Sequence, residues 1–421
     1  MSSFIALIIF VISYLGFVFF SEKRMPIAVA GALLLVATRS ITPIEAFWAV
    51  NWNVIGIFIG MLIVSSIFTE SKAPAYLAEV VVSKVNRLSL ALLLICIITG
   101  FISAFVDNVS TVLIVAPFAL SIAKKLKIDP TQMMLGIAVS SNLQGTATLI
   151  GDPPSMLLGG FAKMNFWNFF FYHGRPSIFF AVELGAIASL IILYFIFKRE
   201  DAKINIKIIE KVSSWWPSVF LVFLVLMLAL SSFIKGNFPY LSGSLCLMFA
   251  AISLTWRKLT DGASVRKKLL SLDWETSIFL ATIFILVGGL TITGWISAFS
   301  RLLSGYIGNN VFLGYTMIVF FSVLVSAFVD NIPYLAVMLP IAMSVATHLQ
   351  IQPALMMFGL LVGACLGGNI TPIGASANIV ACGILKKEGY TVSFGKFARI
   401  GLPFTLAAVF AAYIFIWFVW K

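Results

Sequence analysis

Residues 103–108 read SAFVDN, and the same hexapeptide returns at residues 326–331, an offset of 223 residues. Further matches keep this offset without a gap through the next forty-odd residues: Pro117 with Pro340, Met133-Met134 with Met356-Met357, Gly136 with Gly359, Gly145 with Gly368, Thr148 with Thr371, and Ile150-Gly151 with Ile373-Gly374. Six consecutive identities that include an Asp-Asn pair are not expected by chance, even in an apolar chain. The sequence therefore indicates an internal duplication.

The composition indicates that most of the protein surface lies in the hydrocarbon of a lipid bilayer. Hydrophobic types make up 61% of the 421 residues and charged types 10%, whereas a soluble domain is about half apolar and about a quarter charged. A helix needs roughly 20 apolar residues to cross a bilayer. Clear stretches of this kind occupy residues 4–20, 24–40, 52–69, 177–197, 217–233, 239–256, 275–295 and 400–420. The first lacks a charged start and a cleavage site, so we interpret it as a retained transmembrane helix.

The two copies of the repeat lie in apolar regions that are interrupted. In each we predict a re-entrant hairpin, at 88–124 and 312–347, followed by a broken helix, at 131–165 and 353–385. Each half, 1–198 and 217–421, then crosses the bilayer five times, and the cytoplasmic linker 199–216 leads into a half of opposite orientation. The sequence predicts an all-α polytopic membrane protein with two inverted repeats, about ten transmembrane helices, two re-entrant hairpins and two broken helices.

The distribution of basic residues supports this topology. Of the 28 Lys and Arg residues, 22, including Arg24, fall on one predicted face and six on the other. The positive-inside rule makes the richer face cytoplasmic. Both termini then lie outside a cell inner (plasma) membrane, and the first hairpin opens from the cytoplasm. Two full crossings in place of each hairpin give the same parity, so that alternative stays open. In this interpretation the basic residues behind the net charge of +12 anchor and orient the chain in the membrane, and we expect no nucleic-acid partner.

The hairpin tips carry the first candidate site. An ionised carboxylate at the centre of a transmembrane helix costs about 2.5–3.5 kcal/mol, so Asp107 and Asp330 need a reason to be there. A serine precedes each aspartate by four residues and an asparagine follows it. Carboxylate, amide, hydroxyl and backbone oxygens together suit Na⁺, or a proton on the aspartate. The alternative is that each aspartate only caps the following helix, and the two roles are compatible.

The broken helices carry the second candidate site. The motifs GTATLIGDPPS, at 145–155, and GNITPIGASAN, at 368–378, place glycine and proline inside apolar spans. Such breaks free backbone groups and are tolerated where they are buried or line a wet cavity; a simple kink is the alternative. Asp152 and Asn378 differ between the halves, so we expect them to influence substrate selectivity. The four cysteines and two histidines form no metal-binding pattern, and we expect no cofactor besides Na⁺ or H⁺ as a coupling ion.

At these motifs the chain resembles the ion transporter superfamily that includes ArsB, NhaD, the melanosomal P protein and the divalent anion/sodium symporters. The resemblance covers nearly the whole chain. Through VDN and IGDPP it is most similar to P-protein-like and ArsB/NhaD-like permeases. It implies a scaffold domain, a mobile transport domain that contains the hairpins and broken helices, elevator-type alternating access, and a homodimer in the lipid bilayer.

The resemblance also implies which residues line the sites. The cation or proton sites would consist of Ser103, Asp107, Asn108 and Gly145 in one half, and Ser326, Asp330, Asn331 and Gly368 in the other. The two aspartates are the candidate Na⁺ ligands. The substrate would face Asn108, Asn331, Thr148 and Thr371, to which the broken-helix motifs add Asp152 and Asn378.

Three classes of function are compatible with these features. An antiporter or exporter for a small inorganic ion, coupled to H⁺ or Na⁺, agrees best with two aspartates, which favour a cation, a proton or a neutral metalloid hydroxide. A Na⁺-coupled importer of citrate- or succinate-like carboxylates shares the architecture, but we identify no arginine near the site to neutralise such a substrate. A channel or a membrane enzyme is the third class, and no nucleophile–base set stands out. We therefore predict a transporter and not an enzyme.

Overall fold

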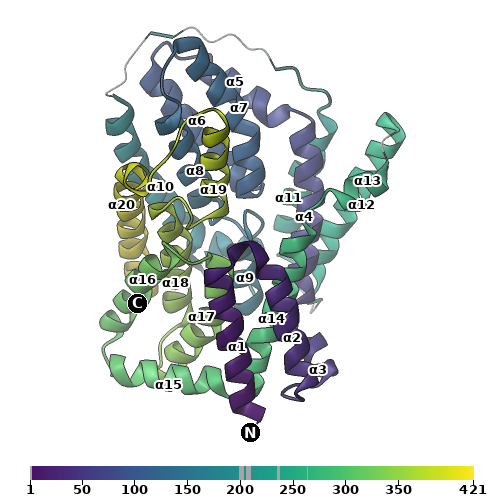
Figure 1. Cartoon of the computed structure of the whole chain (residues 1–421), viewed down its shortest axis with the longest axis vertical. Helices are drawn as coiled ribbons and strands as arrows, with labels where there is room; N and C mark the ends of the chain where they lie inside the picture. The colour runs from purple at the N-terminus through teal and green to yellow at the C-terminus, as the bar shows by residue number, and fades with distance from the viewer. Residues whose placement is uncertain (1, 199–202, 205–209, 235–237, 263) are drawn as a thin grey trace.

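The computed structural model describes residues 2–421 except 199–202, 205–209, 235–237 and 263, so much of the predicted linker 199–216 lies outside the described residues. The described chain is almost entirely helical, which confirms the predicted fold class (Figure 1). Its one sheet is a two-stranded hairpin, β1 (Phe171–Tyr172) with β2 (Arg175–Pro176), in which Tyr172 lies opposite Arg175.

The helices follow the predicted repeat closely. The first half contains α1 (Ser2–Phe19), α2 (Arg24–Ala37), α3 (Pro43–Ala49), α4 (Trp52–Glu70), α5 (Ala73–Val82), α6 (Leu88–Ser103), α7 (Asn108–Leu126), α8 (Thr131–Gly145), α9 (Pro153–Phe161) and α10 (Ile178–Phe197). The second half contains α11 (Trp216–Ser231), α12 (Leu241–Asp261), α13 (Val265–Leu270), α14 (Trp274–Ile292), α15 (Trp295–Ile307), α16 (Val311–Ser326), α17 (Asn331–His348), α18 (Pro353–Gly367), α19 (Ser376–Lys387) and α20 (Phe394–Trp420). Short 3₁₀ turns occur at Ser21–Lys23, Trp167–Phe169 and Gly368–Ile370. The helices α6 and α16 begin and end at positions separated by the 223-residue offset.

Helix length and composition identify the strongest membrane spans. Within the described residues, six helices are long and apolar enough to cross a bilayer, or seven if the bent pair of α15 and α16 is one span. Four of the six, α4, α10, α14 and α20, coincide with predicted crossings, and the other two are α7 and α18. The helices α1, α2 and α11 are apolar but shorter. Length alone therefore leaves open whether each hairpin is re-entrant or crosses fully.

The two predicted hairpins lie at different levels of the molecule: in Figure 1, α6 and α7 lie in the upper half and α16 and α17 in the lower half. The helix that follows each break packs against the hairpin of the other repeat. The segment α9 packs against α17, and α19 packs against α7 and α8. Each hairpin is thus covered by the broken helix of the opposite repeat, which brings both sets of polar motifs to the middle of the fold.

A second group of helices forms beside this assembly. The helix α4 packs along α12, and α14 packs against α2. A side chain at Gly60 would place its Cβ 2.5 Å from Cys246, so glycine is needed for the close approach of α4 and α12. The helices α10 and α20 pack along each other, and α15 crosses the lower end of the molecule (Figure 1).

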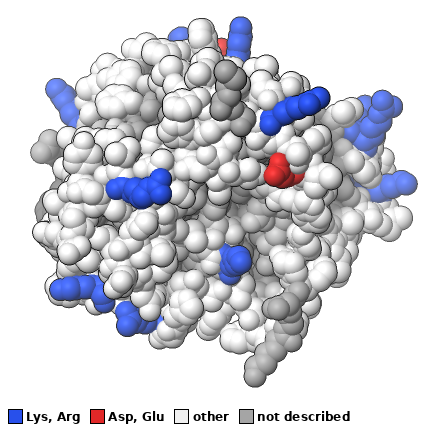
Figure 2. All heavy atoms as spheres, turned by 90° about the horizontal axis from the view of Figure 1, so that it is seen from below, with Lys and Arg blue, Asp and Glu red and all other residues white. Residues whose placement is uncertain are grey.

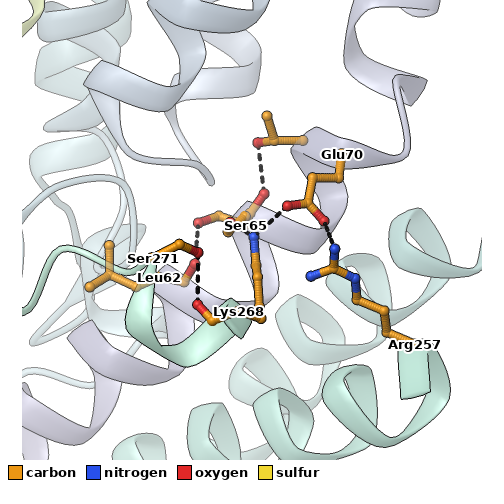
Figure 3. Close-up of polar contacts among 8 residues, drawn as sticks. Leu62, Ser65, Glu70, Arg257, Lys268 and Ser271 are labelled. Atoms are coloured by element: carbon orange, nitrogen blue, oxygen red, sulfur yellow. Dashed lines mark hydrogen bonds and ion pairs between the residues drawn. The ribbon is translucent and has the colours of Figure 1, made fainter. Parts of the chain in front are cut away.

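Ion pairs join α4, α12 and α13 (Figure 3). Glu70, the last residue of α4, pairs with Lys268 at 2.7 Å and with Arg257 at 2.9 Å. The ammonium group of Lys268 also donates to Ser66. Lys268 is buried, with only 5% of its side chain exposed, so its ammonium group depends on Glu70 and Ser66 to replace the water that it has lost. The cluster fixes one end of the α4–α12 unit.

The lower face of the molecule, which contains the N-terminus and α15, is shown in Figure 2. Its surface is mostly uncharged, and the basic side chains that it presents are scattered without forming a patch. This face therefore offers no broad basic surface for a polyanion.

Candidate functional site

Both hairpin aspartates begin a helix. Asp107 is the N-cap of α7, and its carboxylate accepts a hydrogen bond from the backbone N–H of Ser110 at 3.0 Å. Asp330 is the N-cap of α17 and accepts from the N–H of Ile332 at 3.0 Å. The positive end of a helix dipole favours a carboxylate at this position. The capping role is therefore real in both halves, and a second oxygen of each carboxylate is left for another partner.

The first tip is tied to α8 by polar side chains. Ser103 donates to the amide oxygen of Asn108 at 2.8 Å, and its hydroxyl lies 3.0 Å from that of Ser141. Ser141 donates to the backbone oxygen of Asn108 at 3.1 Å. The amide nitrogen of Asn108 donates to Asn142 at 3.2 Å. Asn108 is thus held from three directions.

The second tip has a different set of partners. The hydroxyl of Ser326 donates to the backbone oxygen of Ala364. Ala364 occupies the position that corresponds to Ser141, so the second half lacks that hydroxyl. Among the described residues, the side chain of Asn331 makes no hydrogen bond. No hydrogen bond in the described chain joins Ser326 to Asn331 as one joins Ser103 to Asn108, and the amide of Asn331 is available to a ligand.

The broken helices fasten to the hairpins at equivalent points. Thr148 donates its hydroxyl to the backbone oxygen of Ala104, and Thr371 donates to that of Ala327 at 2.5 Å. Both threonines are buried. Each hydroxyl satisfies a carbonyl at the end of a hairpin helix, where the helix itself leaves the carbonyl unpaired. The contact fixes each break against its own tip.

Glycine is required where the backbone approaches the first tip. A Cβ on Gly145 would lie 2.1 Å from the amide oxygen of Asn108, and a Cβ on Gly151 would lie 2.3 Å from the oxygen of Gly145. In the second half, a Cβ on Gly368 would lie 2.6 Å from the oxygen of Gly374. The duplicated glycines therefore allow the break and the tip to come into direct contact.

The unequal residues of the two breaks leave buried oxygens without partners. Asp152 is the N-cap of α9, and its Oδ1 accepts from the N–H of Ser155 at 3.1 Å. Its Oδ2 is buried and has no hydrogen bond within the described chain, although the amide of Asn108 lies near this carboxylate. Asn378 donates to the oxygens of Gly368 at 2.9 Å and Thr371 at 3.0 Å, and its Oδ1 is likewise buried without a partner. Buried acceptors of this kind need a donor or a cation.

A contact between the halves was not anticipated from the sequence. The amide nitrogen of Asn142 on α8 lies 3.0 Å from both the backbone oxygen of Cys365 and the side-chain oxygen of Asn369. Asn369 donates in turn to the backbone oxygen of Val139 at 3.2 Å. Both asparagines are buried. The polar run Ser140-Ser141-Asn142 inside an otherwise apolar helix was the available signal.

The structure corrects our statement that no arginine lies near the site. Arg24, which we assigned to a cytoplasmic loop, forms an ion pair with Oδ2 of Asp330. Its second terminal nitrogen donates to the hydroxyl of Thr276 at 3.1 Å. Thr276 in turn donates to Asp273 at 2.6 Å. The correction arises because the turn between α1 and α2 reaches the second hairpin tip, a packing that loop charges cannot reveal.

Both tips therefore lie near the start of α14. Asp330 connects to it through Arg24, and the carboxylate of Asp107 lies within electrostatic range of Asp273. Asp107 forms no ion pair among the described residues. Tyr14 on α1 lies within electrostatic range of Asp330. The second tip thus meets α14 through the cation of Arg24, whereas the first tip meets it through the like charges of Asp107 and Asp273.

A separate cavity of about 340 Å³ lies between α6, α8 and α10. Its wall is apolar except for a few polar side chains, among which Glu183 and Gln144 interact with each other. Gln144 directly precedes Gly145, so the cavity adjoins the first break. None of the predicted cation ligands lines it.

The donor set at the tips suits a monovalent ion. Within the described residues, no group of three or more His, Cys, Asp or Glu side chains could hold a metal ion. Na⁺ is bound instead by a few carboxylate, amide and carbonyl oxygens at broken helices. Carboxylate, amide and backbone oxygens are the groups that the hairpins and breaks bring together here.

Comparison with known proteins places the chain among transporters. It is 30% identical to an uncharacterized transporter of Mycobacterium tuberculosis, with 99% of this chain and 98% of the relative covered. It is 26% identical to the P protein of Mus musculus over 90% of this chain and 55% of that protein.

Two solved structures share the fold. The YdaH transporter of Alcanivorax borkumensis matches with a TM-score of 0.56 at 13% identity, over 86% of each chain. MtrF of Neisseria gonorrhoeae matches with a TM-score of 0.58 at 14% identity, over 91% of this chain and 83% of that one. A family model described as citrate transporter matches residues 8–363, the greater part of the sequence. The chain is therefore a multi-pass membrane transporter of the citrate transporter family, within the ion transporter superfamily.

Proposed function

We propose that this protein is a secondary active exchanger that moves a small inorganic ion in a cycle coupled to H⁺ or Na⁺. The observation that carries the proposal is the pair of tip carboxylates, Asp107 and Asp330, each with one oxygen used in capping. Buried ionisable residues inside membrane proteins typically mark ion pathways. The orphan oxygens of Asp152 and Asn378 add acceptors beside the tips.

Alternating access supplies the transport step. The hairpins and broken helices form the mobile unit in this proposal, and the α4–α12 unit with α2 and α14 forms the scaffold, in a homodimer. The contacts within the mobile unit support this division, since each tip is fastened to its own break by Thr148 or Thr371. A unit fastened in this way can slide against the scaffold like an elevator while its ion sites stay intact.

The test uses proteoliposomes loaded with a pH indicator. Addition of Na⁺ outside should produce an internal pH change in the wild-type protein, and Asp107→Asn or Asp330→Asn should each reduce its rate at least about 100-fold, since the carboxylate acts directly on the ion. The exposed Glu45→Gln serves as a control carboxylate and should leave the rate unchanged. Full activity in both tip variants would disprove the role of the aspartates.

A Na⁺-coupled carboxylate importer is the second candidate. The match to the citrate transporter family favours it, and Arg24 supplies the cationic side chain that such a substrate needs near the site. Na⁺-dependent uptake of labelled citrate or succinate into proteoliposomes would identify this function. Uptake should then fall in the Arg24→Gln variant, because a carboxylate substrate would lose its partner.

A further inference from the structure

We propose that Arg24 is a built-in counter-cation of Asp330, which Na⁺ must displace in order to bind, and that this exchange locks the protein when the ion is absent. The inference rests on the proposed function, because it takes Asp330 as an ion ligand. It adds a residue, Arg24, and a rule for when the mobile unit is free to move.

Both oxygens of the Asp330 carboxylate are occupied. Oδ1 accepts from the N–H of Ile332 at 3.0 Å, and Oδ2 pairs with Arg24. A Na⁺ ion that used this carboxylate as a full ligand would compete directly with the guanidinium. The pair is largely shielded from solvent, with 22% of the Arg24 side chain and 30% of the Asp330 side chain exposed, so the competition takes place where charges interact strongly.

Arg24 is positioned by groups outside the mobile unit. It is the first residue of α2, and its second nitrogen donates to Thr276 on α14. Asp273 holds Thr276 through the side-chain hydroxyl at 2.6 Å and the backbone N–H at 2.9 Å. The guanidinium also lies over the ring of Phe279, 5.4 Å from its centre. The fork geometry of arginine allows one end to bind the scaffold while the other binds the tip.

The first tip provides an internal contrast. Asp107 has no ion pair in the described part of the chain, and the charged group within its electrostatic range is Asp273, which has the same sign. An ion can therefore enter the Asp107 site without displacing a protein cation. Two identical hexapeptides thus give one open site and one site that is closed by competition.

The consequence for transport concerns the empty carrier. While Arg24 holds Asp330, the second hairpin is attached to α2 and α14, and the mobile unit cannot slide. Na⁺ binding breaks this attachment because it takes the same oxygen. The mobile unit therefore slides when Na⁺ is bound and stays fixed when the site is empty, which is the condition for strict exchange. A symporter differs, because its empty mobile unit has to return across the membrane.

The experiment measures binding of ²²Na⁺ to the purified full-length protein by scintillation proximity. Every protein in this binding assay, including the one called wild type, carries Asp107→Asn, so that the open first site does not contribute and the second site alone is measured. Arg24→Gln should bind Na⁺ at least about tenfold more tightly than the wild type, because the competing internal cation is gone. Lys23→Gln removes the neighbouring exposed charge and should leave affinity unchanged. Thr276→Val, which frees one end of Arg24 but keeps its charge, should give a smaller gain. Arg24→Lys keeps the charge but loses the fork that reaches both Asp330 and Thr276, so its gain in affinity should be smaller than that of Arg24→Gln, and it tests the competition if the glutamine variant does not fold.

The second readout is flux from liposomes that contain ²²Na⁺ at equal pH on both sides. The wild type should release label much faster into Na⁺ than into Na⁺-free buffer. In Arg24→Gln the two rates should converge, because the empty carrier can now return. An unchanged difference between the two rates would overturn the lock.

The outcomes separate this inference from the proposed function. If Asp330→Asn abolishes Na⁺ binding while Arg24→Gln leaves affinity equal or weaker, Arg24 is not a competitor, although the aspartate site stands. If the wild type binds no Na⁺, the competition is disproved, and proton-coupled transport is judged by the pH assay alone. If Asp330→Asn binds Na⁺ as tightly as the wild type, both ideas fail.

Discussion

The two hairpin tips share the sequence SAFVDN, the aspartate cap and the threonine contact with the break, but their asparagine and aspartate side chains have different partners. At the first tip the asparagine is held by Ser103, Ser141 and Asn142, and the aspartate has no ion pair among the described residues. At the second tip the asparagine is unbonded within those residues, and the aspartate is paired with Arg24. The partners, and not the motif, decide what each tip does.

The difference arises from residues that the duplication did not preserve. Ser141 and Asn142 on α8 correspond to Ala364 and Cys365 on α18, which cannot hold an asparagine side chain. The second tip is instead stabilised from outside its own repeat, by Arg24 at the start of α2. In our proposal, the repeat binds one ion in a fixed site and gates another, with the same six residues at both.

The largest effect should come from removing the hydrogen bonds of the first tip. Asn142→Ala removes three hydrogen bonds at once, those that join Asn142 to Asn108, to Asn369 and to the backbone oxygen of Cys365, so we expect a loss of about 3–5 kcal/mol in the free energy of unfolding. Unfolding by SDS titration in detergent measures this value. The repeat-equivalent variant Cys365→Ala removes one small buried group and should cost about 1 kcal/mol. Equal losses would show that the two halves are supported alike.

The aspartates themselves should differ in stability. Asp330→Asn leaves Arg24 half-buried without its carboxylate, so we expect a loss of about 2–3 kcal/mol. Asp107→Asn keeps a good N-cap and breaks no ion pair, so its change should stay within about 0.5 kcal/mol. The same SDS titration compares the two. A loss in Asp107→Asn as large as that in Asp330→Asn would remove the distinction between the tips.

A smaller effect should follow from crowding the first tip. Gly145→Ala brings a Cβ to 2.1 Å from the amide oxygen of Asn108, and moving that side chain should cost about 1–2 kcal/mol. Gly305 in α15 is a matched control, since its Cβ would meet nothing within 4 Å. Gly305→Ala should stabilise the protein by about 0.5–1 kcal/mol, because alanine favours a helix. Destabilisation by both variants would point to a general intolerance of alanine.

The smallest effect concerns an exposed pair far from the tips. Partial burial opposes ionisation of Asp129, but hydrogen bonds from Thr131 and the ammonium of Lys396, at 3.1 Å, outweigh it and hold the pKa of the carboxyl below its usual range. A lowered pKa in the folded state stabilises the protein above the unfolded-state pKa, near 4, and this gain is lost as the pH falls through the lower folded value.

Asp129→Asn should therefore lower the melting temperature at pH 7 and lose its effect in strong acid. Both side chains of this pair are more than two-fifths exposed, so we expect less than about 1 kcal/mol, well below the effect of Asp330→Asn. Thermal melts of both proteins across pH would measure it. A constant difference at every pH would exclude the ion pair as its source.

The sequence predicted the features that depend on local pattern. The duplicated hexapeptide located both tips, and the helices begin at Asn108 and Asn331 as the motif suggests. Glycine and proline located both breaks. The repeat, the all-α fold and the transporter class followed from these signals, and the comparisons confirm the last. The transported ion, the coupling ion and the moving unit remain predictions.

The features that the sequence could not give are contacts across long chain separations. Arg24 and Asp330 lie 306 residues apart, and no periodicity joins the start of α2 to a hairpin in the opposite repeat. Asn142 was overlooked because its partner in the repeat is a cysteine, so the offset that identified the other site residues gave no signal there. Pairs formed only by packing need the packed structure.

The bond between Asn142 and Cys365 has a consequence for how the chain is made. The two residues are 223 positions apart, and a ribosome that adds 5–20 residues per second needs roughly 10–45 s to synthesise that length. During this time the amide of Asn142 has no partner from the other half. Until α18 is made, water or the insertion machinery has to satisfy this amide, because hydrocarbon cannot. This contact between the halves is therefore completed only when the last sixth of the chain, which begins near Pro353, reaches the membrane.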